Sequence, residues 1–268
     1  AFDLTGANAT PSITTTIVIS GGPFGAVVER AGAADARVFH VSTTGNLTLQ
    51  NVTVRNGDST SGGAIYNRGT LALVDSALIS NTAASGGGLY NESGSSATFT
   101  NSVVRKNSAY YGGGILNVGT VTFTDSSIVT NTATLGGGFD NFGAATFTTA
   151  SLRDNQAEMG GGFYNEPGGY TTLAAVEIGA NRAITTGGGF YNAVGGTVNV
   201  TATNVQSNTA ASAGGGFYSE NGSTTIITNS FITGNVAGNT GGGFDNQGIT
   251  TLTSTDIMTN VATTGGGF

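Results

Sequence analysis

Hydrophobic and polar residues alternate along this chain in short segments of three to five residues. In residues 122–124, for example, Phe123 stands between two Thr residues. Alternation with a period of two is typical of a β-strand that buries one face, and no segment shows the period of a helix. Gly, Asn and Ser, which favour turns, separate the segments. The pattern predicts an all-β chain of many short strands.

The segments belong to a repeat of 24 to 27 residues. Its first marker is a glycine run followed by an apolar residue, with Asn two places further on. The apolar residues are Ile65, Leu89, Ile115, Phe139, Phe163, Phe190, Phe217, Phe244 and Phe268. The Asn residues are Asn67, Asn91, Asn117, Asn141, Asn165, Asn192 and Asn246, and Ser219 replaces Asn once. A fixed period of this size indicates a solenoid or another stacked array.

A second marker, apolar-x-x-Asn-x-Ala, lies between successive first markers. Its Asn residues are Asn81, Asn107, Asn131, Asn155, Asn181, Asn208, Asn235 and Asn260. A further apolar residue stands eight places before each of these: Leu73, Phe99, Phe123, Phe147, Leu173, Val200, Ile227 and Leu252. This spacing is constant, so we expect all insertions to lie at one corner, after the Asn of the first marker.

About 24 residues cannot bury an apolar face alone, so the repeats must stack. The sequence therefore predicts an all-β, single-stranded, right-handed parallel β-helix with about 24–27 residues and three strands per coil. We expect one domain over residues 1–268, with irregular coils in 1–56 and regular repeats in 57–268. Gly and Asn at the corners are expected to take positive φ. The Asn side chains are expected to form ladders, and the Phe column from Phe139 to Phe268 is expected to stack inside.

Composition narrows the classes of function. Charged residues make up 9% of the chain, and the net charge is −7 with only eight Lys and Arg, which are dispersed. Nucleic-acid binding, which needs a basic stripe, is not expected. No apolar run is long enough to insert into a membrane as a helix. The chain has no Cys, which excludes disulfides and thiolate metal sites. It begins at Ala1 without Met, as after removal of a signal peptide or as a cut from something longer.

Two motifs resemble a known group of proteins. Gly62-Gly63-Ala64-Ile65-Tyr66-Asn67 and Ser80-Asn81-Thr82-Ala83 are similar to the repeat units of bacterial secreted and surface right-handed β-helix proteins. The repeat also resembles that of the polymorphic outer-membrane proteins, which are adhesins. The resemblance covers nearly the whole chain. It implies an exported, extracellular or cell-surface protein, and it implies no particular activity.

The sequence predicts no catalytic, cofactor or metal site, because the acidic residues are scattered. Asp75 and Asp125 occupy equivalent positions two coils apart, with Asn101 between them, and are interpreted as polar turn residues. A pair of carboxylates on one face, as in polysaccharide-cleaving β-helices, is the alternative. His40 is the only His, and its alternation with Phe39 and Val41 predicts that it faces water.

Two rows of side chains are candidate ligand faces. In five coils a Tyr residue follows the apolar member of the first marker: Tyr66, Tyr90, Tyr164, Tyr191 and Tyr218. These Tyr side chains are expected outside or at a corner of the coil. There they could stack on sugars, on another subunit, or on each other. Outward Thr pairs flank the inner apolar residue in three successive coils: Thr98, Thr100, Thr122, Thr124, Thr146 and Thr148. Ice-binding β-solenoids use such grids, although Thr also simply favours strands.

The ends of the chain suggest a subunit contact. The sequence stops in mid-coil at Gly265, Gly266, Gly267 and Phe268. Phe2-Asp3-Leu4-Thr5-Gly6 echoes Phe139-Asp140-Asn141-Phe142-Gly143 and Phe244-Asp245-Asn246-Gln247-Gly248, so another copy could continue the helix head to tail. A contact of this kind propagates into a filament, and a fragment of a longer protein is the alternative. The leading hypothesis is a non-enzymatic extracellular structural β-helix, either a filament subunit or an adhesin stalk. The alternatives are a rod that binds or cleaves carbohydrate, including surface glycans, and an ice-binding protein.

Overall fold

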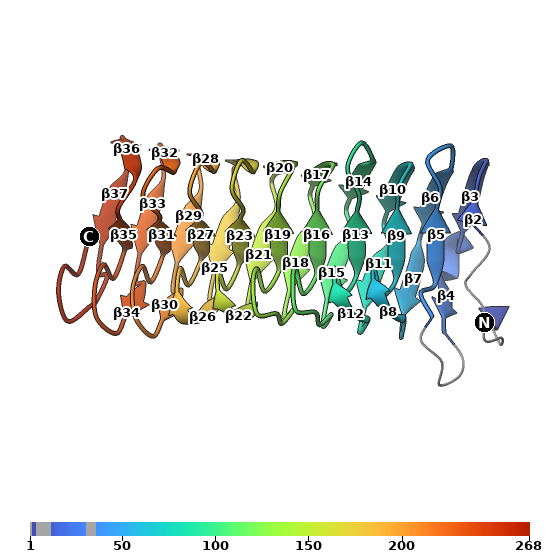
Figure 1. The fold of residues 1–268 in the computed structure, drawn as a ribbon, viewed down its shortest axis with the longest axis horizontal. Coiled ribbons are helices and arrows are strands. Elements are labelled where there is room, and N and C mark those ends of the chain that lie inside the picture. Colours follow the sequence, from blue (N-terminus) through green and yellow to red (C-terminus); the bar gives the residue numbers. More distant parts are fainter. Residues whose placement is uncertain (1, 4–11, 31–35) are drawn as a thin grey trace.

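Each repeat contributes strands in the same order, and equivalent strands of successive coils pair in parallel. The computed structural model describes residues 2–3, 12–30 and 36–268. In this part the chain forms a parallel β-solenoid of about nine turns with three strands per coil and essentially no helix. The coils follow one another along a straight rod, with β2 and β3 at one end and β37 at the other (Figure 1). The predicted all-β parallel β-helix is confirmed.

The three strands of each coil build three long sheets. Sheet B holds the first marker, as the strands β2 (Ser12–Ile13), β5 (Phe39–Val41), β9 (Ile65–Asn67), β13 (Leu89–Asn91), β16 (Ile115–Asn117), β19 (Phe139–Asn141), β23 (Phe163–Asn165), β27 (Phe190–Asn192), β31 (Phe217–Ser219) and β35 (Phe244–Asn246). Sheet C follows, as β3 (Thr16–Ser20), β6 (Asn46–Gln50), β10 (Thr70–Val74), β14 (Ser96–Thr100), β17 (Thr120–Thr124), β20 (Ala144–Thr148), β24 (Tyr170–Ala174), β28 (Thr197–Thr201), β32 (Thr224–Thr228) and β36 (Ile249–Thr253).

Sheet A completes each coil. Its strands are β1 (Phe2–Asp3), β4 (Ala26–Glu29), β7 (Val52–Arg55), β11 (Ala77–Ile79), β15 (Val103–Arg105), β18 (Ser127–Val129), β21 (Ser151–Arg153), β25 (Glu177–Gly179), β29 (Asn204–Gln206), β33 (Phe231–Thr233) and β37 (Asp256–Met258). Short extra strands, here called set D, precede the glycine run in some coils: β8 (Asp58–Ser61), β12 (Thr82–Ser85), β22 (Gln156–Met159), β26 (Arg182–Thr186), β30 (Thr209–Ala210) and β34 (Val236–Ala237). A 3-10 turn, η1 (Gly22–Phe24), lies between β3 and β4.

The irregular first coils stack on the regular ones. Strand β3 pairs in register with β6, β6 pairs with β10, and β5 pairs with β9. The backbone of Phe2–Asp3 pairs with β4 in sheet A, whereas Phe139–Asp140 lies in sheet B. The predicted equivalence of these two dipeptides is therefore wrong, and Leu4, Thr5 and Gly6, which extended it, lie outside the described residues.

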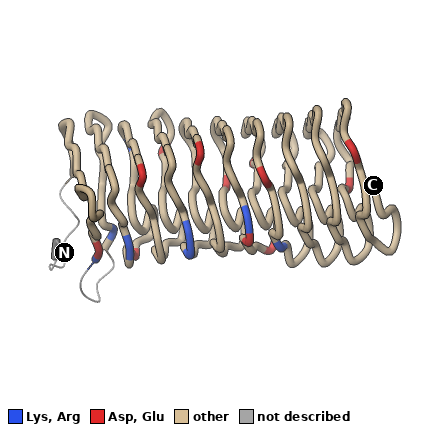
Figure 2. The backbone as a smooth tube through the Cα atoms, turned by 180° about the vertical axis from the view of Figure 1, so that it is seen from behind, with Lys and Arg blue, Asp and Glu red and all other residues tan. Residues whose placement is uncertain are grey.

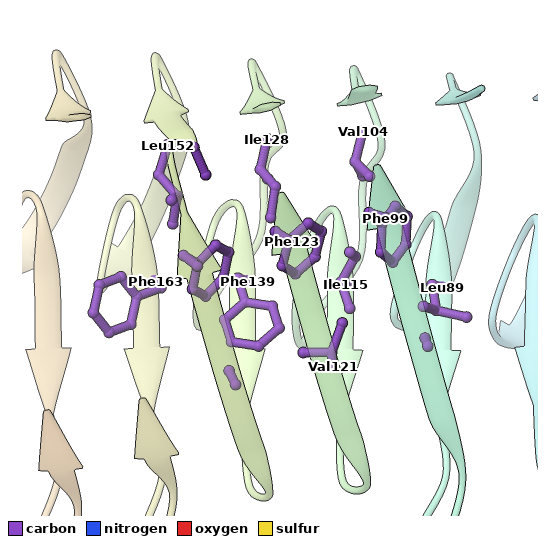
Figure 3. Close-up of a cluster of buried hydrophobic side chains, with 14 of the residues drawn as sticks. Leu89, Phe99, Val104, Ile115, Val121, Phe123, Ile128, Phe139, Leu152 and Phe163 are labelled. Carbon is purple, nitrogen blue, oxygen red and sulfur yellow. The ribbon is translucent and has the colours of Figure 1, made fainter. Parts of the chain in front are cut away.

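Two stacks of aromatic rings, one from sheet C and one from sheet B, fill much of the core. Phe99, Phe123 and Phe147 of sheet C stack with centroids 4.6 Å apart. The predicted column in sheet B is confirmed from Phe163 onward, through Phe190, Phe217, Phe244 and Phe268, with centroid spacings of 4.9, 4.8, 4.8 and 5.3 Å. Phe139 instead packs edge-on against Phe123 and Phe147. Phe123 lies above Phe139 in the close-up of Figure 3.

Two ladders of buried Asn side chains run beside this core. The amide of each second-marker Asn donates to Oδ1 of the next, from Asn81 to Asn260, over 2.9 to 3.1 Å. The first-marker Asn residues do the same from Asn67 to Asn192, over 2.8 to 3.1 Å. At the next coil Ser219 replaces Asn, and Asn192 donates to Thr225 Oγ1 instead. The predicted amide ladders are confirmed.

The expectation that these Asn residues take the positive φ of the corners is wrong. That conformation belongs to the residue before each second-marker Asn, such as Ser80 at 56° and Lys106 at 57°. It also belongs to the residue that follows each sheet C strand from β6 onward, such as Asp75 at 50° and Asn101 at 48°. The ladder Asn side chains point inward to bond along the axis, so the bend is made one residue earlier.

The position of the insertions also needs a correction. The corner after Asn165 does carry extra residues, as predicted, with Gly168 at φ 80°. A second insertion lies in set D, where Ala157 pairs with Ala183 but Met159 pairs with Thr186. Gly-rich turns absorb this bulge because it lies outside the three core sheets.

Candidate functional site

The outward face of sheet C carries the predicted Thr grid. Its ten strands are in register, so the first, third and fifth side chains of each strand form three columns along the rod. Thr98, Thr122 and Thr146 are direct neighbours in one column, and Thr100, Thr124 and Thr148 in the next. Four of these six are exposed, and Thr122 and Thr124 are half-buried. The strand geometry gives this grid spacings of about 4.8 Å along the rod and about 6.6 Å across it.

This face also lacks charge. Thr fills more than half of the outward positions of sheet C, and none of these positions holds Asp, Glu, Lys or Arg. In the tube view most Lys and Arg segments lie along the lower side of the rod, away from the upper corner where sheet C runs (Figure 2). The Thr columns are interrupted by Ala72, Val74, Ala174, Asn199 and Ile226. The result is a flat, uncharged strip of hydroxyl and methyl groups.

The predicted Tyr row lies on the outward face of sheet B, and its rings stack on each other. Centroids are 5.2 Å apart for Tyr66 and Tyr90, 4.7 Å for Tyr164 and Tyr191, and 5.0 Å for Tyr191 and Tyr218. Tyr164 and Tyr191 are each only 8% exposed. Neighbouring coils therefore cover most of the ring faces on which a sugar would stack.

His40 begins this row, since it pairs with Tyr66 across β5 and β9 at a ring distance of 5.3 Å. Its Nδ1 bonds Ser12 Oγ at 2.8 Å, and its Nε2 is buried without a partner. The prediction that His40 faces water is therefore wrong for most of the ring. Burial lowers the pKa of His40, and the nearby Arg37 lowers it further.

The Tyr row is interrupted for two coils, where Leu116 and Asp140 take its place between Tyr90 and Tyr164. A cavity of about 530 Å³ lies over this gap. It is lined by Ser85, Tyr90, Tyr111, Leu116, Val118, Leu135, Phe142 and Glu166. We call this cavity the ladder gap.

Asp140 lies beneath the ladder gap. Its side chain points to the outer side of sheet B, because its neighbours Phe139 and Asn141 point into the core. In its own coil it stands between Leu135 and Phe142, which both line the gap. Asp140 is fully buried, and within the described residues neither of its carboxylate oxygens has a hydrogen bond of normal geometry. An ionised carboxylate without a partner is costly to bury.

The pKa values of Asp140 and Glu166 reflect this buried environment. Burial raises the pKa of Asp140 well above its usual range, the Glu166 carboxylate raises it further, and the backbone amide of Asn141 offsets part of the shift. Burial alone raises the pKa of Glu166 to about 7. The gap therefore combines aromatic walls with two acids that ionise reluctantly.

The acids singled out from the sequence do not form a site. Asn101 donates to Asp75 Oδ1, and Thr149 donates to Asp125 Oδ1, each at 2.5 Å. Asp75 and Asp125 both have positive φ, which confirms that they are polar turn residues. Within the described ranges, no group of three or more His, Cys, Asp or Glu side chains is placed to hold a metal ion.

The residues expected at subunit contacts lie at opposite ends of the rod. Phe268 stacks on Phe244 and is 76% exposed, and the exposed Gly265 follows a bridge between Thr240 and Thr264. Gly266 and Gly267 accept the backbone amides of Gly243 and Phe244, so they continue the coil pattern of the preceding glycine runs. Only the backbone of Phe2 and Asp3 is described, as β1.

Comparisons of the chain with known protein families, with curated proteins and with solved structures gave no match. The likeness to surface β-helix proteins thus rests on the repeat motifs themselves. In the described part of the chain, no helix is long and apolar enough to cross a membrane.

Asp140 and Glu166 were not among the candidates found in the sequence. Aligning the repeats on Φ-x-Asn places Asp140 in the same column as the Tyr residues, and this replacement was the available signal. Glu166 lies in the corner after Asn165, whose length varies between coils. The repeats therefore offer no equivalent residues from which its burial could be predicted.

Proposed function

We propose that the chain is a non-enzymatic structural rod, the stiff section of an exported surface protein, serving as an adhesin stalk or as part of a filament. The observation that carries this proposal is the unbroken Asn ladder from Asn81 to Asn260, in which every coil is bonded to both neighbours. Extracellular location and adhesion follow from the motif resemblance and belong to the proposal.

A rod built in this way resists bending and stretching. Bending would have to open parallel sheet pairs on one side and break buried amide bonds, whose groups have no water to replace their partners. The stacked Phe rings and the ladders repeat in nearly every coil, so stiffness is distributed along the axis. These are the properties that a spacer needs.

The assay that tests the non-enzymatic part incubates the purified chain with neutral and acidic polysaccharides across acidic to alkaline pH. We expect no new reducing ends or unsaturated products beyond those of a heat-denatured control. Product that increases in proportion to the folded protein would overturn the proposal and favour the carbohydrate-cleaving alternative.

Negative-stain electron microscopy separates a filament from a stalk. Thin fibres that lengthen with protein concentration would support head-to-tail assembly through Phe268 and the opposite end. Short single rods at every concentration would support the stalk.

A second function is favoured by a different observation, the uncharged Thr strip of sheet C. Regular hydroxyl and methyl groups on a flat face can order water without the disruption that charges cause, so we propose ice binding as the second candidate. The test is thermal hysteresis of the wild type against Thr122→Tyr, with Ser127→Tyr on sheet A as the matched control. Hysteresis that is lost only in Thr122→Tyr supports ice binding, and absence of hysteresis in the wild type refutes it.

A further inference from the structure

A structural rod does not need the ladder gap. A Tyr residue at the two interrupted positions would fill it, as in the coils on both sides. In the neighbouring coils on both sides a Tyr ring occupies the same column, and Tyr164 stacks on Tyr191. Here Leu116 and Asp140 leave a hollow, and Asp140 sits under it as a fully buried acid whose carboxylate oxygens have no hydrogen bond of normal geometry within the described residues. A buried polar group without its usual hydrogen bonds calls for an explanation, and one explanation is a ligand that binds in the hollow.

The lining of the hollow indicates the chemistry of that ligand. Three aromatic side chains, Tyr90, Tyr111 and Phe142, surround it, and Glu166 supplies a carboxylate. No Lys, Arg or His lines the cavity. Aromatic faces and nearby carboxylates both attract a positive charge. An anion or an acidic sugar would meet only like charge.

The same lining argues against the simpler cations. A divalent metal ion such as Ca²⁺ takes about six to eight oxygen ligands. The partly aliphatic lining of the cavity has too few oxygen atoms to supply them. A primary ammonium has three N–H donors that each need an acceptor. A fully alkylated ammonium has no N–H donor, carries a diffuse charge, and gains from both aromatic and aliphatic contact.

We therefore propose that the ladder gap binds a small quaternary ammonium compound, with the cation enclosed by Tyr90, Tyr111 and Phe142 and held by the charge of Glu166. A ligand with an anionic group beside the cation is disfavoured, because the lining offers that group no basic partner. This binding activity is separate from the proposed structural role of the rod.

Binding of choline chloride, measured by isothermal titration calorimetry and ligand-observed NMR, tests the proposal. We expect saturable binding, about tenfold weaker binding of the uncharged tert-butyl analogue of choline, and weaker binding of phosphorylcholine. Affinity should rise as the pH passes upward through about 7, where Glu166 loses its proton. No saturable choline binding, or equal binding of the uncharged analogue, would overturn the proposal.

Variants locate the binding. Glu166→Gln should weaken choline binding about tenfold, whereas Glu158→Gln, which removes the same charge from an exposed residue outside the lining, should leave it unchanged. Leu116→Tyr should abolish binding by extending the Tyr66–Tyr90 stack into the hollow, with the melting temperature preserved. Equal losses in Glu166→Gln and Glu158→Gln, or full affinity in a folded Leu116→Tyr variant, would refute the site.

Discussion

Asn131 makes two hydrogen bonds to the side-chain oxygen of Asn155. Its side-chain amide donates to Asn155 Oδ1 at 3.0 Å, and its backbone N–H donates to the same oxygen at 2.9 Å. The amide of Asn131 also donates to the carbonyl of Val104 at 3.0 Å, in the preceding coil. One side chain thereby connects three coils. All these groups are buried, so each Asn is needed by the coil on either side.

Replacing Asn131 by Ala is expected to lower the free energy of unfolding by about 3 kcal/mol. The backbone N–H and the side-chain amide of Asn107 both donate to Asn131 Oδ1 and would be left buried without an acceptor. Chemical denaturation measures the change. The control, Asn204→Ala on the exposed face of sheet A, should change stability by less than about 0.5 kcal/mol. An equally small change in the Asn131→Ala variant would refute the claim that the Asn ladder stabilises the fold.

Ala202 is expected to be a weak point of the corner after sheet C. It has φ 50°, a conformation that is costly for Ala and tolerated by Asn, and the equivalent residues Asn101 and Asn229 are Asn. Ala202→Asn should therefore raise stability by about 0.5–1 kcal/mol. Ala144→Asn, in a strand, should not raise it. A destabilised Ala202→Asn variant would contradict this account of the corner.

The stability of the rod should fall as the pH rises from about 4.5 to about 7. Folded Glu166 keeps its proton up to about pH 7, whereas in the unfolded chain it ionises near its ordinary pKa of 4.5. Over this window folded Glu166 binds more protons than unfolded Glu166, so its contribution to the free energy of unfolding decreases with pH and becomes constant above the window. Melting curves across this range should show a smaller fall in Glu166→Gln and an unchanged fall in Glu158→Gln. The same fall in both variants would exclude Glu166 as the cause.

Removal of one whole coil should leave the rod folded. Deleting residues 120–143 joins Gly119 to Ala144, restores the same corner sequence pattern, and lets Asn107 meet Asn155. We expect a cooperative melting transition close to that of the wild type. Deleting only 120–131 puts the strands out of step and should abolish folding. Unfolding of the whole-coil deletion would show that the coils are not interchangeable.

Much of this fold could be predicted because the repeat imposes a single solution. The recurrence of Phe163, Phe190 and Phe217 specifies a column, and the recurrence of Asn155 and Asn181 specifies a ladder, whatever the details of one coil. The register shift between the pairs Ala157–Ala183 and Met159–Thr186 was not predicted, because Gly-rich turns hide a one-residue change in spacing.

The candidate site was harder to predict for a related reason. The Thr grid depends only on strand alternation and was placed correctly. The ladder gap depends on a departure from the repeat at Leu116 and Asp140, and on the burial of Glu166 by a corner of irregular length. A search for recurring residues gives little weight to positions where the repeat is interrupted.

The central claim, a rod that keeps its length, is tested most directly by distances between spin labels. The chain has no Cys, so Thr48→Cys and Thr251→Cys, eight strand steps apart on sheet C, can be labelled alone. Pulsed electron paramagnetic resonance should give one narrow distribution near 38 Å, and the pair Thr48→Cys and Thr146→Cys should give about half of that distance. A broad distribution, or a long distance well below twice the short one, would contradict the account of a rigid rod.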